Sequence, residues 1–238
     1  MKLEYLDWDS TFFGKKIGKL LFDFHLPDHK SLDEALLRAK LENFDLIYLF
    51  CKKDYFVSSE FLTRYNGCLV DRKIIFEGHN NISSDSFNIV EYEKEGVDDR
   101  LLNLAYTSGE FSRYKKDSNF SENEFKRFYK TWIENSVNRI IADKVFVSID
   151  GKGGINGMVT IKISGDIGVI GLIAVHPSCQ GKGIGHQLVK VVQKYLLESG
   201  IYILNVATQL DNTQACTFYR KIGLKDKSIS NVYHFWIK

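Results

Sequence analysis

Apolar residues recur along the chain in short runs of strand length and in longer segments with helical periodicity. In the N-terminal third, two stretches rich in apolar residues indicate buried strands, and two segments with helical spacing lie before and between them. The pair Ser31 and Glu34 matches a capping box at the start of the first helix. These elements predict an α/β half-domain with helices over 31–42 and 58–65 and strands over 44–50 and 69–76.

A polar stretch from Gly78 to Ser86 separates this half-domain from the remainder of the chain. It is rich in Gly, Asn and Ser, which favour turns, and it follows an apolar strand. We therefore predict two domains, an N-terminal α/β half-domain over 1–86 on the acceptor side and a second domain over 87–238.

The second domain begins with two predicted helices and continues with three closely spaced strands. Ser121 and Glu124 match a second capping box, and short turns that contain glycine join the strands, as in an antiparallel meander. The pattern predicts an α/β (α+β) fold with a mixed, largely antiparallel sheet. Its expected helices cover 97–107, 122–137, 183–199 and 212–222, and its strands 144–149, 156–164, 166–176, 201–208 and 232–237.

Composition and charge exclude several classes of function. Hydrophobic residues make up 44% of the 238 residues, and 32 Lys and Arg against 30 Asp and Glu leave a formal net charge of +2. This balance does not favour a nucleic-acid partner, and no apolar run is long enough to span a membrane. The 4 cysteines lack the spacing of a zinc site, so we expect no metal. The N-terminus lacks the apolar core of a signal peptide, so we expect a cytoplasmic protein.

The segment from Gly171 to Gly185 is the main candidate for chemistry. An apolar strand ends in a loop with three glycines, which opens an amphipathic helix. Glycines let the backbone approach a ligand, and the free N–H groups and dipole of a helix N-terminus attract anions such as pyrophosphate. Lys182 adds a positive charge. The glycine spacing fits neither a dinucleotide-binding fingerprint nor a Walker loop.

This segment resembles the acetyl-CoA signature Q/R-x-x-G-x-G/A of the GNAT (GCN5-related N-acetyltransferase) superfamily. Gln180, Gly183 and Gly185 match all three fixed positions, and the likeness extends over about residues 88–238. The resemblance implies acetyl-CoA as the co-substrate. It implies that the preceding strand hydrogen-bonds the pantetheine and splays from its neighbour, and that the loop binds the pyrophosphate of CoA. The residues concerned are Ile173, Ala174, Val175, Gln180, Gly181, Lys182, Gly183, Ile184 and Gly185.

A second motif, Asn212 to Leu224, resembles the superfamily segment N-x-x-A-x-x-x-Y-x-x-x-G-F, with Leu224 in place of Phe. The resemblance implies that Asn212 contacts the pantetheine arm and that Tyr219 is the catalytic general acid near the thioester sulfur. A spacing of seven residues places both on one helix face. A phenol with a pKa of about 10 can protonate a thiolate whose thiol has a pKa of about 8.5.

Two further stretches, 6–18 and 108–136, resemble the dTDP-fucosamine acetyltransferase branch of the superfamily. This resemblance implies an acyltransferase whose small-molecule acceptor is a nucleotide-linked 4-amino-deoxysugar. Arg113 could bind the diphosphate in a bidentate way, and Tyr114, Phe111 or Trp132 could stack on the thymine. Of these residues we predict Arg113 and Tyr114 as substrate-binding. We read Lys115 and Lys116 as solvent-facing.

The sequence leaves several questions open. The general base could be His176, Glu110, Asp71 or His234. The acceptor could instead be a protein N-terminus, a polyamine or an aminoglycoside, and a non-catalytic sensor of acyl-CoA is a further alternative. The preferred acyl length and the oligomeric state, including a homodimer, are also open.

Overall fold

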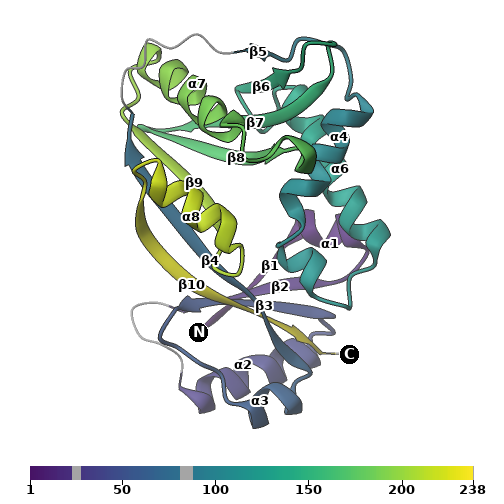
Figure 1. Ribbon diagram of the computed structural model, residues 1–238. Helices are drawn as coiled ribbons and strands as arrows, with labels where there is room; N and C mark the ends of the chain where they lie inside the picture. The colour runs from purple at the N-terminus through teal and green to yellow at the C-terminus, as the bar shows by residue number, and fades with distance from the viewer. Residues whose placement is uncertain (23–27, 81–87, 238) are drawn as a thin grey trace. The chain divides into compact units, whose positions relative to one another are not determined.

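A computed structural model describes residues 1–22, 28–80 and 88–237, and it divides the chain into two compact units (Figure 1). The first unit contains Met1–Ile74 together with Ile229–Lys238, and the second contains Ile75–Ser228. The domain limits predicted from the sequence, 1–86 and 87–238, stay a prediction, because their boundary lies outside the described residues.

The first unit is built on a mixed sheet in the order β1-β2-β3-β10. β1 pairs antiparallel with β2, β2 runs parallel to β3, and β3 is antiparallel to β10. The first unit also contains the beginning of β4. Its elements are β1 (Lys2–Tyr5), α1 (Asp7–Phe13), β2 (Ile17–Leu21), α2 (His29–Leu41), β3 (Leu46–Lys52), α3 (Ser59–Arg64), β4 (Gly67–His79) and β10 (Lys225–Trp236), of which β4 and β10 continue into the second unit.

The predicted start of α2 is wrong. The N-cap is Asp28, whose carboxylate accepts a hydrogen bond from the Ser31 backbone N–H at 2.7 Å. Ser31 therefore lies in the first turn and does not cap the helix. Asp is as good an N-cap residue as Ser, and Asp28 stands one turn earlier in the sequence.

The second unit has the strand order β4-β9-β8-β7-β6-β5. Pairing is antiparallel from β5 to β8 and parallel between β8 and β9, which confirms the predicted mixed, largely antiparallel sheet. Its further elements are β5 (Ile89–Glu91), α4 (Asp99–Gly109), α5 (Arg113–Lys116), α6 (Glu122–Val137), β6 (Lys144–Ile149), β7 (Ile155–Ser164), β8 (Ile167–Val175), α7 (Ile184–Glu198), β9 (Ile203–Gln209) and α8 (Thr213–Lys221), with a short 3₁₀ turn at Pro177–Cys179.

Helices cover both faces of this sheet (Figure 1). A Cβ atom placed on Gly168 of β8 would lie 2.3 Å from Leu196, so this position faces α7. A Cβ atom on Gly171 would instead approach Trp132 of α6, at 3.6 Å. Because side chains alternate along a strand, β8 presents one face to α7 and the other to α6.

The capping box predicted at Ser121 is confirmed. The Ser121 hydroxyl accepts from the Glu124 backbone N–H, and the Glu124 carboxylate accepts from the Ser121 N–H at 2.8 Å. Two of the donors at the start of α6 are therefore satisfied by side chains. Within residues 1–22, 28–80 and 88–237, no helix has the length and apolar character needed to cross a bilayer.

Candidate functional site

β8 and β9 separate in the middle of the second unit's sheet. Their pairing ends at Ile170 and Val206, although β8 continues to Val175. Gly171, the next residue of β8, is exposed even though it lies in a central strand between two buried neighbours, Ile170 and Leu172. The sheet is therefore open along the last five residues of β8 on the side facing β9.

An irregularity in β8 lies at the same place. The register with β7 shifts between Val159 and Ile161, so that Gly171 and Leu172 both oppose Thr160. The Leu172 N–H donates to the Thr160 hydroxyl at 2.8 Å instead of to a backbone carbonyl. This is the arrangement of a β-bulge, which redirects a strand and often occurs beside functional sites.

The open edge of β8 directs backbone N–H groups away from β7. The His176 N–H donates to the Asn156 carbonyl of β7 at 2.8 Å. Because hydrogen bonding alternates along an antiparallel pair, Val175 and Ile173 direct their N–H groups away from β7, toward the diverging side. Ala174 is bonded within the pair. Two of the three predicted strand residues are thus oriented to pair with an extended ligand.

The glycine loop after β8 is a group of unpaired backbone donors. Gly181 and Gly183 have φ angles of 78° and 80°, a conformation that glycine adopts without strain. Among the described residues, no N–H group from Gly181 to His186 has a hydrogen-bond acceptor, and α7 has no side-chain cap. Successive free N–H groups at a helix N-terminus form an anion site. Lys182 is exposed beside them.

Gln180 and Gly185 connect this loop to its neighbours. The Gln180 side-chain amide donates to the Val175 carbonyl at 3.2 Å and accepts from Gln214 of α8 at 3.0 Å. A Cβ atom on Gly185 would lie 3.4 Å from the Phe218 ring of α8, so α7 and α8 are close at this point. The end of β8, the loop and both helix starts therefore gather most of the predicted cofactor residues.

Asn212 occupies the N-cap of α8. Its side-chain oxygen accepts from the Ala215 N–H at 3.0 Å, which fixes the amide group at the start of the helix. Asn212 thus caps the helix with its oxygen, and its NH₂ group has no acceptor among the described residues.

Tyr219 lies on the buried face of α8, at 3% exposure. Its ring packs against Phe76 at 5.3 Å and Phe218 at 5.2 Å between centroids. Burial, with a smaller effect of Cys216, raises the pKa of the phenol well above its ordinary value. The hydroxyl is therefore a neutral donor at physiological pH, and it has no partner among the described residues.

The two predicted substrate-binding residues lie on α5. Tyr114 is buried at 7% exposure and packs on Phe128 at 4.3 Å between centroids, so it belongs to an aromatic core. Arg113 stacks on the Tyr114 ring and donates to its hydroxyl at 2.7 Å.

The neighbouring lysines of α5 form ion pairs. Lys115 pairs with Glu122 at 2.6 Å, and Lys116 pairs with Asp211, the residue before Asn212. The second pair holds α5 beside the start of α8. Both lysines are thus engaged by carboxylates of the protein itself.

The four candidates for the general base are dispersed. His176 follows β8 and is exposed, and its Nδ1 atom lies 2.8 Å from the Ser178 hydroxyl. Glu110 follows α4 and is exposed. Asp71 and the fully buried His234 belong to the first unit. Within the described residues, no group of three His, Cys, Asp or Glu side chains is placed to hold a metal ion.

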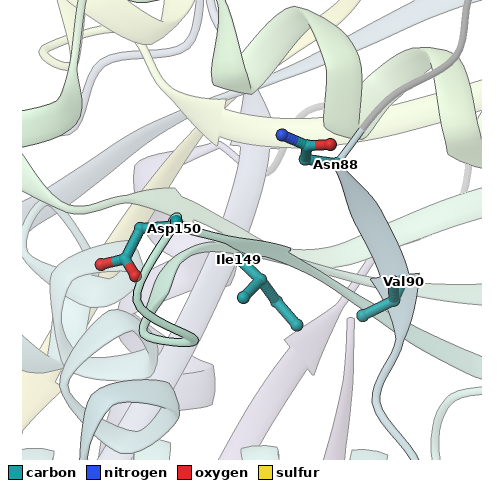
Figure 2. Close-up of a pocket in the computed structure, with 5 residues that line it drawn as sticks. Asn88, Val90, Ile149 and Asp150 are labelled. Atoms are coloured by element: carbon teal, nitrogen blue, oxygen red, sulfur yellow. The ribbon is translucent and has the colours of Figure 1, made fainter.

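A pocket at the β5–β6 edge contains none of the predicted site residues. Figure 2 shows the lining residues Asn88, Val90, Ile149 and Asp150. Gly151 also lines the pocket. The Asp150 carboxylate accepts the N–H groups of the turn residues Lys152 and Gly154, each at 2.8 Å, and these bonds lower its pKa. Asp150 therefore holds the turn between β6 and β7.

Sequence reasoning missed Thr160 and the irregularity at Gly171, and it considered Trp132 only as a ring that could stack on a thymine. A glycine inside an apolar strand is the one signal that pointed to an irregularity there. Recognising the other two residues requires the register of β7 and β8 and the packing of α6.

Comparison with known proteins identifies the family. The model of the acetyltransferase (GNAT) family matches residues 105–224, about half of the chain. dTDP-fucosamine acetyltransferase from Escherichia coli O6:H1 is 28% identical over 159 residues, which are 66% of this chain and 65% of that protein. The spore coat polysaccharide biosynthesis protein SpsD of Bacillus subtilis is 25% identical over 142 residues, 59% of this chain and 48% of that protein.

A mycothiol acetyltransferase from Arthrobacter sp. is 26% identical over 127 residues, 50% of this chain and 37% of that protein. This chain thus covers less than two thirds of each of these three relatives.

Solved structures share the fold. A protein of unknown function from Staphylococcus epidermidis superposes with a TM-score of 0.65 at 11% identity, covering 94% of this chain and 85% of that one. A tandem GNAT protein of the clavulanic acid biosynthesis pathway gives a TM-score of 0.56 at 12% identity, covering 94% and 76%. With the family model matched across α4 to α8, this chain belongs to the GNAT acetyltransferase family.

Proposed function

We propose that the protein is an acetyl-CoA-dependent N-acetyltransferase that acts on a small amine. One observation carries this proposal: the open edge of β8 leads directly into the unpaired backbone amides from Gly181 to His186. An extended ligand that ends in a pyrophosphate fits that combination, and the GNAT family uses acetyl-CoA.

The two features support a proposed position for each part of the co-substrate. The loop from Gln180 to Gly185 would hold the pyrophosphate, with Lys182 adding charge. Ile173 and Val175 would pair with the amide groups of the pantetheine as a neighbouring strand does. The side-chain NH₂ of Asn212 would donate to the same arm. The thioester would then reach the opening at Gly171.

In the proposed reaction, a neutral amine attacks the acetyl carbonyl, the C–S bond breaks with the thiolate of CoA as the leaving group, and the nitrogen loses one proton, which restores the phenol of Tyr219 through water. Tyr219 would donate its proton, or a hydrogen bond, to the departing sulfur. Burial keeps this phenol protonated over the pH range of the reaction. A backbone N–H at the open edge of β8 would polarise the carbonyl, and the remaining rate enhancement would come from orienting two bound reactants.

For the acceptor we propose a nucleotide-linked 4-amino-deoxysugar. The support is the match to dTDP-fucosamine acetyltransferase and the half-buried guanidinium of Arg113 on α5. The ion pair between Lys116 and Asp211 holds α5 beside the start of α8, where Asn212 would contact the cofactor. Because the Tyr114 ring is buried, Arg113 is the better candidate of the two for binding the diphosphate.

A thiol-release assay with acetyl-CoA tests both levels of the proposal. The acceptor panel would contain dTDP- and UDP-linked 4-amino-sugars, a polyamine, an aminoglycoside and a peptide N-terminus. We expect thiol release with the nucleotide sugars. Thiol release with only another amine would support the acetyltransferase activity and refute the sugar as the acceptor. Tight acetyl-CoA binding without turnover of any acceptor would favour the acyl-CoA sensor.

A further inference from the structure

Trp132 of α6 lies next to the opening in the sheet. A Cβ atom on Gly171 would be 3.6 Å from the indole Nε1 of Trp132, and Gly171 is the first residue of β8 beyond its pairing with β9. Gly168, three residues earlier, faces α7. Trp132 is thus on the face of the sheet opposite to α7, whose N-terminus carries the proposed pyrophosphate site.

Neighbouring rings fix the orientation of Trp132. Phe128 meets it edge to face, with centroids 5.5 Å apart at 84°, and Tyr129 lies nearly parallel to it at 5.9 Å and 13°. Tyr129 is itself pressed against α4, because a Cβ atom on Gly109 would be 2.4 Å from its ring. An indole held on two sides by aromatic rings loses little additional entropy when it binds a ligand.

The indole N–H of Trp132 is a donor without an acceptor in the described part of the chain. The side chain is partly exposed, so the N–H is open to a ligand. Thr160, the polar group nearest to Gly171, already accepts from the Leu172 N–H at 2.8 Å. Indole nitrogen can only donate, and a partly buried tryptophan usually uses this bond.

We propose that Trp132 is a substrate-binding residue whose indole N–H donates to an oxygen of the acceptor on the carbon next to the reacting amine. The amine itself is excluded as the partner, because its lone pair must remain available for the carbonyl. In a 4-amino-sugar the two neighbouring carbons carry the hydroxyl on carbon 3 and the ring oxygen on carbon 5, and we assign the hydroxyl, which is the better acceptor, as the partner. This inference rests on the proposed function, since it assumes an acetyl-transfer site at Gly171.

The test is a double-mutant cycle between protein and substrate. Trp132→Phe removes the N–H and keeps an aromatic ring. The two acceptors are dTDP-4-amino-4,6-dideoxygalactose and its 3-deoxy analogue. We expect each single change to lower kcat/KM about tenfold, as for the loss of one well-formed hydrogen bond. The combined change should lower it no further, because both changes remove the same bond.

Acetyl-CoA affinity, measured by calorimetry, is the control for folding and should be the same in Trp132→Phe and the wild type. An unchanged kcat/KM of the variant would overturn the role of Trp132 alone. The same conclusion would follow if the variant still lost about tenfold in kcat/KM when the 3-deoxy sugar replaced the parent sugar. If the wild type acetylates neither sugar, the sugar acceptor is wrong and this inference is wrong with it. The two failures are therefore distinguishable.

Discussion

Tyr219, the proposed general acid, is a single side chain whose ionisation is controlled by burial. The fold places its phenol in an apolar environment between Phe76 and Phe218, where the anion is disfavoured and the pKa is raised. The same burial leaves the hydroxyl without a partner among the described residues. A thiolate brought to this position would be the strongest acceptor available to it.

We predict that Tyr219→Phe lowers kcat at least a hundredfold, the lower range for loss of a general acid. The dissociation constant of acetyl-CoA should stay within about twofold, because the phenol acts only once charge develops on sulfur. Steady-state kinetics and calorimetry measure the two quantities. An unchanged kcat would remove Tyr219 from the mechanism.

The raised pKa of Tyr219 also predicts a pH dependence of stability. An unfolded tyrosine ionises near pH 10, whereas the folded state keeps this phenol neutral to higher pH. The contribution to the free energy of unfolding is thus fully present below about pH 10 and is lost as the pH rises further. Denaturant titrations between pH 8 and 11 should show a shallower alkaline loss in Tyr219→Phe. Equal slopes for both proteins would contradict a buried neutral phenol.

Individual residues of the candidate site differ in how far the sequence could predict them. Gln180, Gly183 and Tyr219 belong to motifs with fixed spacing, so their positions could be read directly from the sequence. Gly171 and Trp132 are brought together by the β8 register and by the packing of α6, which no local pattern encodes.

At the scale of elements, the loop between β8 and α7 depends on a backbone conformation that glycine alone adopts easily. We predict that Gly183→Val raises the dissociation constant of acetyl-CoA at least tenfold, because a side chain would stand where the amides must reach the pyrophosphate. Gly183 has a φ of 80°, and a Cβ there would meet nothing within 4 Å. The loss should therefore come from blocked binding more than from packing.

Gly165, in the turn between β7 and β8, provides a matched control for this variant. It has a φ of 61° and equally open surroundings. Gly165→Val should therefore carry a similar backbone strain of about 1–3 kcal/mol while leaving acetyl-CoA affinity unchanged. Chemical denaturation and calorimetry on both variants separate strain from binding. Equal loss of affinity in the two variants would refute the pyrophosphate loop.

The start of α8 combines a structural and a proposed binding role in Asn212, and two substitutions separate them. Asn212→Ser keeps an oxygen to cap the Ala215 N–H, so we expect nearly wild-type stability but a higher KM for acetyl-CoA. Asn212→Ala should raise KM similarly and also lose about 1 kcal/mol of stability. A wild-type KM in Asn212→Ser would restrict this residue to capping.

The sequence located the longer helices and the more apolar strands, and it missed several short or polar segments. The range expected for the helix over 122–137 and for the strand over 144–149 agrees with α6 and β6. The sequence reading missed β1, α1, β2, β5 and α5, each with at most seven residues. It also placed the start of β10 at 232, because the first residues from Lys225 are polar and exposed. Such segments are too short or too polar for periodicity to distinguish them from loops.

At the scale of the whole molecule, the last strand belongs to a unit that begins at the N-terminus. The end of β10 pairs with β3 from Ser230 opposite Lys52 to Trp236 opposite Leu46. Tyr233 and Phe235 of this strand are buried in the core of the first unit. A linear reading assigned 232–237 to the second domain because neighbouring elements usually pack together. Pairing across such a sequence separation is invisible to local patterns.

The first unit is built from two separate parts of the chain. We predict that a substitution in its core lowers the stability of this unit without changing acetyl-CoA affinity. Phe235 is fully buried against Phe61, so Phe235→Ala should destabilise the first unit by about 3–5 kcal/mol. Every residue of the proposed cofactor site lies between Ile75 and Ser228. We therefore expect faster proteolysis within residues 1–74 of the variant, with acetyl-CoA affinity within about threefold of wild type.

Phe125→Ala, which empties a similarly buried position on α6 of the second unit, is the comparison for this experiment. It should reduce acetyl-CoA binding, because α6 packs on the sheet that carries the open edge of β8. Limited proteolysis with mass spectrometry, alongside calorimetry, follows both effects in each variant. If Phe235→Ala abolishes acetyl-CoA binding while Phe125→Ala preserves it, the cofactor site depends on the first unit and its assignment to Ile75–Ser228 alone is wrong.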